Sequence, residues 1–339
     1  MPYVLLVAAA AVWGGSFAVG KVLVGEVDPF VVAWVRFLVA SAAFAVGETV
    51  LGLRARQAAG RRATAAEPAA AVPSGRAPTW RDWALLGLTG VFGYNAFFFY
   101  GLTLTTATES SLICAFAPVV TALIGLAFLG EKPSPRKTAG IALSVLGVAL
   151  VILGAAAPAP VAAAGGLSPW GRLVGDLLML ASVLCWAIYS LVGKRVLEGT
   201  SAFTATARAT YWGAAFFTVS VVLRLGRAWP APALSLLQPG RLPGLLYLAL
   251  VCTVFGFVAW YRGLEATEVS TAAVFLNLIP VSTLIIAALT LGERLTGTQL
   301  GGGALVVAGV TLVSVVPVRE SGERPGKDSG RRGEDSKSG

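Results

Sequence analysis

The sequence predicts an all-α membrane protein in which ten transmembrane helices form two inverted five-helix repeats. The first observation is composition, since the 339 residues are 56% hydrophobic and 13% charged, with a mean hydropathy of +0.77. A soluble domain carries far more charge and less apolar surface. The second is the recurrence of apolar stretches of about 20 residues, the length that crosses a bilayer core. The third is an internal repeat.

Ten apolar stretches predict the helices in order. They cover residues 3–24, 29–52, 81–104, 108–129, 136–155, 172–196, 201–224, 241–263, 268–291 and 297–317. The first stretch has no basic region before it and is longer than the apolar part of a signal peptide. We therefore interpret it as the first transmembrane helix.

The repeat relates the two halves of the chain. Residues 101–151 align with residues 263–313 without a gap. Further upstream the same order of motifs recurs in both halves after one change of spacing, which matches the longer loop that follows the second helix. Matched pairs include Gly101 with Gly263, Pro118 with Pro280, Gly147 with Gly309, Trp13 with Trp186, and Lys21 with Lys194. Because each half holds an odd number of helices, the second copy must start on the opposite side of the membrane.

The domain boundaries follow from this arrangement. We expect repeat 1 over residues 1–155, a linker over 156–171, repeat 2 over 172–317 and a disordered tail over 318–339. Repeat 1 includes a basic Ala/Pro/Gly-rich loop over 53–80, which we also expect to be disordered.

Charge predicts the orientation. Most of the 26 Lys and Arg residues lie in the loop over 53–80, in the tail and in the short loops on the same side. The positive-inside rule then places both termini in the cytoplasm of a protein of the bacterial inner membrane. The net charge of +9 is explained by this topology, so we expect contact with membrane lipid and no nucleic-acid partner.

Several motifs resemble a known family. The segments "VWGGSFAVGK", "DPFVVAWVRFLVA" and "APVVTALIGLAFLGEK" resemble the EamA domain of the drug/metabolite transporter superfamily, and "CWAIYSLVGKRV" and "IPVSTLIIAALTLGER" repeat the pattern in the second half. The resemblance implies a ten-helix metabolite transporter or exporter. It leaves the substrate open, because members of the family carry different molecules.

Inverted repeats are a recurring plan of secondary transporters, in which substrate binds near the midplane between the repeats. We therefore expect a secondary transporter that moves a small polar metabolite, of the amino-acid or organic-acid type, by alternating access. Multidrug or toxic-compound efflux is the alternative. An enzyme is not expected, because no nucleophile, acid dyad or metal set is clustered. Without histidine, and with three cysteines that lack metal-ligand spacing, no cofactor or metal is expected either.

Two arginines fall inside predicted helices. Arg36 lies seven residues past Pro29, or about 10 Å along a helix axis. Arg208 lies at a similar depth from the opposite side, one residue out of register with Arg36 in the repeat alignment. An arginine at membrane depth is costly and typically functional, although a side chain that reaches back to the interface is the alternative. We expect at least one of the two to face a substrate cavity.

Other polar and aromatic positions are candidates for substrate binding or gating. Asn95 and Asn277 need a partner helix, a water molecule or a ligand inside apolar helices. Phe99, Trp260 and Tyr261 belong to matched aromatic runs, of which some members can line a cavity.

Two matched prolines mark candidate helix breaks. Pro118 and Pro280 lie near the centres of the fourth and ninth predicted helices, where proline frees a backbone carbonyl. Interrupted helices at matched positions indicate a binding site in transporters, although a packing kink shared by duplication is equally compatible.

The remaining charges receive simpler interpretations. Lys21 and Lys194 lie close to helix ends, and we interpret both as anchors at the membrane interface. No carboxylate falls at the middle of a predicted helix, so Glu109 is the best remaining candidate for ion coupling. Glycines such as Gly140 and Gly147 predict close helix packing within the chain, with a homodimer contact as the alternative to a monomer.

Overall fold

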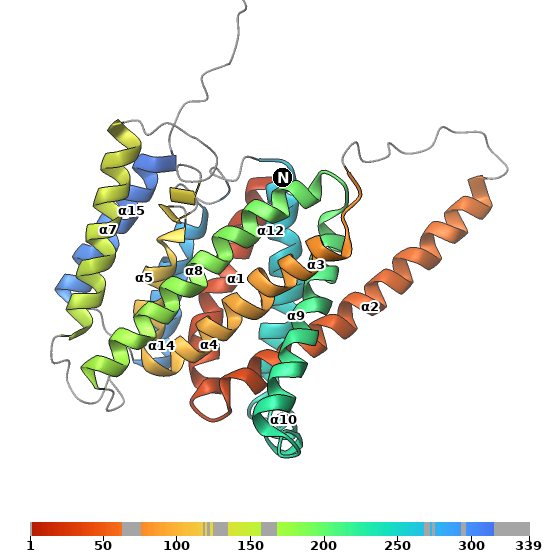
Figure 1. Cartoon of the computed structure of the whole chain (residues 1–339), viewed down its shortest axis with the longest axis horizontal. Helices are drawn as coiled ribbons and strands as arrows, with labels where there is room; N and C mark the ends of the chain where they lie inside the picture. Colours follow the sequence, from red (N-terminus) through yellow and green to blue (C-terminus); the bar gives the residue numbers. More distant parts are fainter. Residues whose placement is uncertain are drawn as a thin grey trace, which may run out of the picture.

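The computed structural model describes residues 2–62, 76–117, 119–120, 123–124, 135–156, 168–267, 272, 275–292 and 296–314. All regular structure in these residues is helical, which confirms the predicted all-α class. Five helical stretches are long and apolar enough to cross a membrane, and two shorter apolar helices accompany them among the described residues. The chain is thus a multi-pass membrane protein (Figure 1).

The first half contains the elements of five predicted spans. They are α1 (Pro2–Val24), α2 (Pro29–Arg62), the continuous stretch α3 (Trp80–Leu86), η1 (Gly87–Gly93) and α4 (Tyr94–Leu104), then α5 (Ala107–Cys114) and α7 (Pro135–Ala156). The second half repeats this order. It contains α8 (Pro169–Leu197), α9 (Ala202–Leu225), α10 (Pro230–Ser235), the stretch α11 (Leu242–Leu246), η2 (Tyr247–Phe255) and α12 (Gly256–Glu265), then η3 (Phe275–Asn277), α14 (Leu278–Leu291) and α15 (Gly297–Ser314).

Local sequence explains where several helices begin. Thr106, Ser168 and Ser201 each cap a helix, because their hydroxyls accept a backbone N–H from the first turn. Asp28 does the same for α2 with its Oδ1 atom. Glycine also marks the end of a helix: Gly292, directly after the last residue of α14, adopts a positive φ of 65°, which glycine tolerates without strain.

Two predicted boundaries differ from those in the structure. Helix α2 continues to Arg62, although we predicted a loop from residue 53, because residues 53–62 are mostly good helix formers such as Leu, Arg, Gln and Ala. Helix α8 begins at Pro169, inside the predicted linker, because Ser168 caps it there. Residues 63–75 of the predicted loop and the predicted tail over 318–339 lie outside the described residues.

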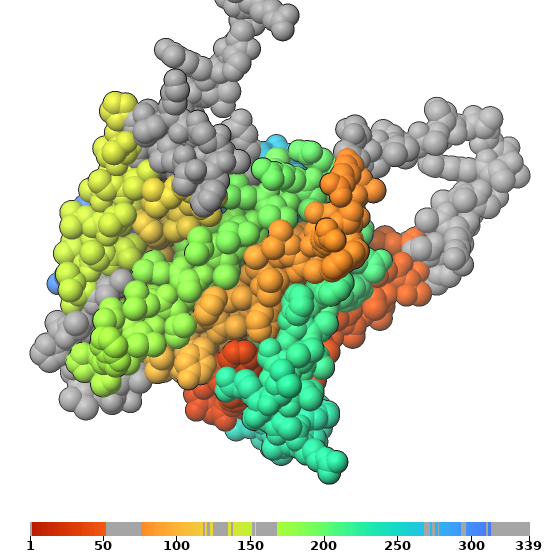
Figure 2. Space-filling model, in the orientation of Figure 1, coloured from red at the N-terminus to blue at the C-terminus, as the bar shows by residue number. Residues whose placement is uncertain are grey.

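The two halves of the sequence are interlocked. Helix α1 packs against α12 and α14 of the second half, whereas α8 packs against α4 and α5 of the first half. Helices α2 and α9 pack against each other and each contacts the π-helical segment of the other half. Figure 2 shows α8 running diagonally beside the α3–α4 stretch, with α7 on one side and α9 on the other. The chain forms two spatial groups, α1, α2, α12 and α14 against α4, α5, α8 and α9, and the contact between α2 and α9 joins them.

Helices α7 and α15 form a separate pair at one edge of the molecule (Figure 1). A methyl group added at Gly147 would collide with the Gly302 carbonyl and with Val306. Gly309 lies in the same way against the Gly140 carbonyl. These glycines therefore allow close packing within the chain.

Two π-helical segments interrupt the third and eighth spans at matched positions. In the repeat alignment, η1 over residues 87–93 pairs with residues 249–255 of η2. Each is followed directly by an α-helix, α4 or α12. A π-helical turn displaces backbone carbonyls from the regular hydrogen-bond ladder, and such turns are frequent at functional sites.

The outer surface is apolar. Side chains such as Leu223 and Leu289 are about four-fifths exposed, at 80% and 81%. Exposure of this kind on many helices is expected where lipid, not water, surrounds the protein.

Candidate functional site

A central cavity lies between the two spatial groups of helices. In this conformation it has about 40 Å³ of room, enough for a few water molecules. Its walls come from α1, α2, α12 and α14 on one side and from α4, α5 and α8 on the other. The lining residues are Trp13, Ser16, Phe17, Arg36, Tyr94, Asn95, Phe98, Cys114, Ala117, Val183, Trp186, Phe257, Leu276 and Ile279.

Arg36 provides the charge of this cavity. It is 4% exposed and projects from α2. Its Nε atom donates to the Leu248 carbonyl at 3.1 Å and to Thr253 Oγ1 at 2.8 Å, both in η2. Its Nη1 atom donates to Asn95 Oδ1 at 3.2 Å. The guanidinium is therefore fixed by neutral groups, as the cost of burying a charge requires.

Asn95 links Arg36 to the other π-helical segment. The Nδ2 atom of Asn95 donates to the Val91 carbonyl at 2.8 Å and to the Gly90 carbonyl at 3.4 Å. Both carbonyls belong to η1. Arg36 is thus held by η2 directly and by η1 through Asn95, so the displaced carbonyls of both segments position the charge.

Part of the guanidinium remains available. The Nη2 atom of Arg36 makes no hydrogen bond with the described part of the chain, and no carboxylate there forms an ion pair with Arg36. Nη1 keeps a second hydrogen beside Nη2. A ligand carboxylate in the cavity could accept two parallel hydrogen bonds from this edge.

Aromatic rings form the rest of the cavity. The matched residues Trp13 and Trp186 meet edge to face, with ring centroids 5.2 Å apart and planes at 83°. Phe257 contacts both rings, and Tyr94 stacks against Phe98. Trp13 is held in place because its Nε1 atom donates to the Cys252 carbonyl at 2.9 Å. The cavity combines one cation with broad apolar faces.

Three predicted aromatic residues lie behind the lining. Phe99, Trp260 and Tyr261 are essentially unexposed. The Phe99 ring lies 5.7 Å from the Arg36 guanidinium, Trp260 packs on Trp13 and Trp186, and Tyr261 stacks on Tyr189. They support the lining residues without reaching the cavity.

The other predicted positions lie elsewhere. Arg208 projects from α9, has a half-exposed side chain and pairs with Glu48 at 3.5 Å. Asn277 belongs to η3 beside the lining residue Leu276, but its side chain lies outside the described part. Pro280 is the third residue of α14, not its centre, and lines a separate apolar pocket. Pro118 lies outside the described residues.

We expected the two matched lysines to anchor the protein at the membrane interface, but in the structure both donate to backbone carbonyls of the chain. Lys21 Nζ donates to the carbonyls of Leu102 and Thr105, at 2.7 and 2.6 Å. Lys194 Nζ donates to the matched carbonyls of Leu264 and Thr267, at 2.6 and 2.8 Å. Each lysine thus satisfies the orphan carbonyls at the end of α4 or α12.

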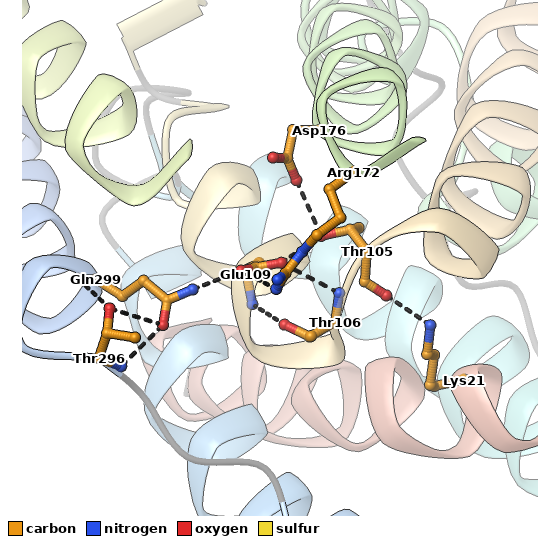
Figure 3. Close-up of polar contacts among 8 residues, drawn as sticks. All are labelled: Lys21, Thr105, Thr106, Glu109, Arg172, Asp176, Thr296 and Gln299. Atoms are coloured by element: carbon orange, nitrogen blue, oxygen red, sulfur yellow. Dashed lines mark hydrogen bonds and ion pairs between the residues drawn. The ribbon is translucent and has the colours of Figure 1, made fainter. Parts of the chain in front are cut away.

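A second polar group surrounds Glu109 (Figure 3). Glu109 is 1% exposed, and its Oε1 atom accepts from Arg172 Nη2 at 2.8 Å and from Gln299 Nε2 at 2.5 Å. Thr105 Oγ1 lies 2.7 Å from Glu109 Oε2 and 2.9 Å from Asp176 Oδ1. We call these five residues the Glu109 cluster. It ties α5, α8 and α15 together at one end of the bundle.

Sequence reasoning missed several of these residues. Trp13 and Trp186 were matched by the repeat, and a matched tryptophan inside each opening helix of a repeat was the signal for the cavity. Arg172 and Asp176 were not among the predicted site residues. Their position one turn apart on the same helix face was the signal for a shared polar site.

Comparisons with known proteins agree with this structure. The sequence profile of the EamA-like transporter family matches residues 1–153 and 173–315. An uncharacterized transporter of Archaeoglobus fulgidus is 32% identical, over 92% of this chain and 96% of its own length. A probable amino-acid metabolite efflux pump of Escherichia coli is 28% identical, over 91% of this chain and 93% of its own.

The chain is also similar to an exporter and to a solved structure. A probable terminal-alkyne amino-acid exporter of Streptantibioticus cattleyicolor is 28% identical, over 75% of this chain and 82% of its own length. A solved crystal structure superposes with a TM-score of 0.60 at 19% identity, covering 91% of this chain and 94% of that one. At this identity the superposition supports the fold alone.

Proposed function

The chain belongs to the EamA-like transporter family, and from this premise we propose that it carries a small metabolite with a carboxylate, of the amino-acid or organic-acid type, across the membrane by alternating access. Like its family and relatives, the protein is a transporter and not an enzyme. The substrate class and the mechanism are the proposal.

The substrate class is proposed from the burial and the hydrogen-bond partners of Arg36. Its charge is buried in the central cavity, it has no acidic partner among the described residues, and its Nη1–Nη2 edge is available. A carboxylate would pair with that edge through two hydrogen bonds, whereas a permanent cation would be repelled. The rings of Trp13 and Trp186 would then contact the apolar part of the substrate. The names of the two amino-acid exporters among the relatives support this class.

The alternative is efflux of drugs or toxic compounds. The aromatic lining favours it, because flat apolar rings bind lipophilic molecules, including cations that stack on them. The two functions differ in their prediction for charge, so a lipophilic cation is the natural competitor in the test.

Interlocking of the halves constrains the movement. Because α1 packs on the second half and α8 on the first, the two sequence repeats cannot rock as separate bodies without breaking these contacts. The units that move are instead the two spatial groups that face each other across the cavity. Room of about 40 Å³ is too small for an amino acid, so the groups separate to load substrate.

We further propose that the protein lies in the bacterial inner membrane with both termini in the cytoplasm. The charge bias of the loops supports this orientation. The Glu109 cluster then lies at the outer end of the bundle, since its residues lie at the end of the third span and at the starts of the fourth, sixth and tenth spans.

Substrate counterflow in proteoliposomes tests the function. Liposomes that hold the purified protein are loaded with one unlabelled L-amino acid and diluted into its labelled form, across a panel of amino acids and organic acids. We expect transient accumulation of at least one of them above its equilibrium level, because only a carrier exchanges bound substrate. Tetraphenylphosphonium is the matched lipophilic cation. Counterflow of that cation, with none for the acids, would favour drug efflux, and no counterflow by any compound would reject a carrier.

A further inference from the structure

No residue of the Glu109 cluster is among those that line the central cavity, and the cluster has no sequence-matched counterpart in the other repeat. In the repeat alignment Glu109 pairs with Thr271, Asp176 with Tyr3 and Gln299 with Lys137. The matched lysine contacts are kept in both halves, so duplication alone would have preserved structural contacts of this kind. The two acids and the arginine of this cluster are not repeated at the matched positions, which points to a task that only this end performs.

One hydroxyl lies between the two carboxyl groups. Thr105 Oγ1 is 2.7 Å from Glu109 Oε2 and 2.9 Å from Asp176 Oδ1, both within the range of O–H···O hydrogen bonds (Figure 3). A hydroxyl has one hydrogen, and an ionised carboxylate can only accept. Both contacts are therefore hydrogen bonds only when one carboxyl group carries a proton and donates it to Thr105 Oγ1.

The surroundings decide which carboxyl group holds that proton. Glu109 accepts from Arg172 and Gln299 as well as from Thr105, so its negative charge is well satisfied. Asp176 is 1% exposed, and Thr105 is the hydrogen-bond partner of its side chain in the described part of the chain. No described cation forms an ion pair with Asp176. Burial without an ion-pair partner disfavours a second negative charge, so Asp176 is the acid to which we assign the proton.

The charged groups around Asp176 are Arg172, Glu109 and Lys21, and each of them has other hydrogen-bond partners. Arg172 is on its own helix α8 and donates to Glu109 instead, and Glu109 faces it from α5. From α1, Lys21 donates to the Thr105 carbonyl, and from α15 the cluster receives only the neutral Gln299. The side chain of Arg172 is nine-tenths buried, and its Nε atom has no hydrogen-bond partner within the described part of the chain. The cluster thus contains one unsatisfied buried donor, which is available when the charge of the cluster changes.

The same helices connect the cluster to the cavity. Helix α5 carries Glu109 and the lining residue Cys114, and α8 carries Asp176 and the lining residue Trp186. Trp186 lies ten residues beyond Asp176, about 15 Å along the axis. A change in how α5 and α8 are held at the cluster therefore moves the walls of the cavity.

We propose that Asp176, with Thr105 and Glu109, is a proton-binding site through which transport is coupled to the proton gradient. The inference rests on the proposed carrier function. With a proton on Asp176, the cluster holds one negative and one positive charge and draws α5, α8 and α15 together. When the proton leaves to the water at this end, Asp176 and Glu109 are both ionised around one hydroxyl. Their repulsion separates the helices and opens this end of the cavity.

The test measures the driving force of a pH gradient. The full-length protein is reconstituted in liposomes of neutral lipid, with the membrane potential clamped by potassium and valinomycin, and the probe is the amino acid that gives counterflow. A gradient of one pH unit supplies about 1.4 kcal/mol per proton, so coupling to one proton changes the steady-state concentration ratio of the probe about tenfold. We expect this change for the parent protein and none for Asp176→Asn.

Matched variants separate proton binding from general damage. Glu26→Gln removes another acid that pairs with an arginine, Arg241, and is expected to keep the tenfold change. Thr105→Ser keeps the shared hydroxyl and the response, whereas Thr105→Val removes both. A tenfold change that persists in Asp176→Asn would overturn the proposal, as would a parent protein that gives counterflow but ignores the pH gradient.

A second measurement does not depend on transport. Infrared difference spectra of the purified protein in lipid, taken between acid and alkaline pH, are expected to contain the C=O band of a buried carboxylic acid. The band should be absent from Asp176→Asn and present in Glu26→Gln. If the parent shows no counterflow, the carrier function fails, and the infrared band alone decides the proton site. A band that survives Asp176→Asn rejects the site even where counterflow is normal.

Discussion

One guanidinium determines the polarity of the central cavity. Arg36 is held by Leu248, Thr253 and Asn95. None of these residues is charged, so no negative charge in the described chain neutralises the guanidinium through these contacts. The sequence could identify Arg36 as a candidate from its depth. It could not separate Arg36 from Arg208, because the depth of a residue in a helix does not tell which side faces the cavity.

Substituting these two arginines separates the two roles. Arg36→Ala is expected to weaken binding of a carboxylate probe by roughly 1.5–3 kcal/mol, about tenfold to a hundredfold, because a charged hydrogen-bonding partner is lost. Arg36→Lys should restore part of this affinity, since a point charge cannot form two parallel hydrogen bonds. Isothermal titration with the amino acid identified by counterflow measures the effect. Arg208→Ala is the matched control, and equal losses in both variants would contradict the assignment of Arg36.

The matched lysines act on stability. Lys194→Met leaves the carbonyls of Leu264 and Thr267 without their donor, and we expect about 1–3 kcal/mol of destabilisation because buried carbonyls are left unsatisfied. Thermal unfolding in detergent, followed by circular dichroism, measures it. The neighbouring Arg195 is exposed, so Arg195→Met should leave the unfolding temperature unchanged. Equal stability of the two variants would return Lys194 to the role of an interface anchor.

At the scale of elements, the π-helical segments are the feature that the sequence did not predict. Nothing in "GLTGVFG" or "YLALVCTVF" distinguishes a π-turn from an α-turn, because both segments are predominantly apolar. The segments persist because Asn95 and Thr253 use the carbonyls that a π-turn displaces. Helices were therefore predictable from composition, whereas their irregular turns depend on partners that only folding brings together.

The pairing of α7 with α15 gives a prediction for an element. Gly147→Val is expected to destabilise the protein by about 1–3 kcal/mol, because the added side chain meets the Gly302 carbonyl and Val306. Gly301 lies on α15 with open space around it, so Gly301→Ala should be neutral or slightly stabilising. Detergent unfolding curves of the two variants provide the comparison. Tolerance of Gly147→Val would mean that α7 and α15 do not pack this closely.

At the scale of the whole molecule, orientation is the property to test. Reporter fusions after Ala77 and after Gly339 are both expected to give a cytoplasmic signal, because most basic residues lie on that side. Alkaline phosphatase and green fluorescent protein, which are active on opposite sides of the inner membrane, form a matched pair of reporters. A periplasmic signal from either position would invert the molecule and place the Glu109 cluster at the inner end.

The sequence by itself determined that this is an all-α membrane transporter built from a repeated unit, and it offered Arg36 and Glu109 as candidate site residues, because length, hydropathy and the depth of a charge are properties of the chain. Only the tertiary structure showed that α1 packs against the second half of the chain and α8 against the first. It also showed that Arg172 and Asp176 lie in one polar cluster with Glu109. The physical reason is that lipid and the protein interior are equally apolar. A membrane helix therefore shows no clear polar face in its sequence, and only packing reveals which side of it meets another helix, a cavity or the bilayer.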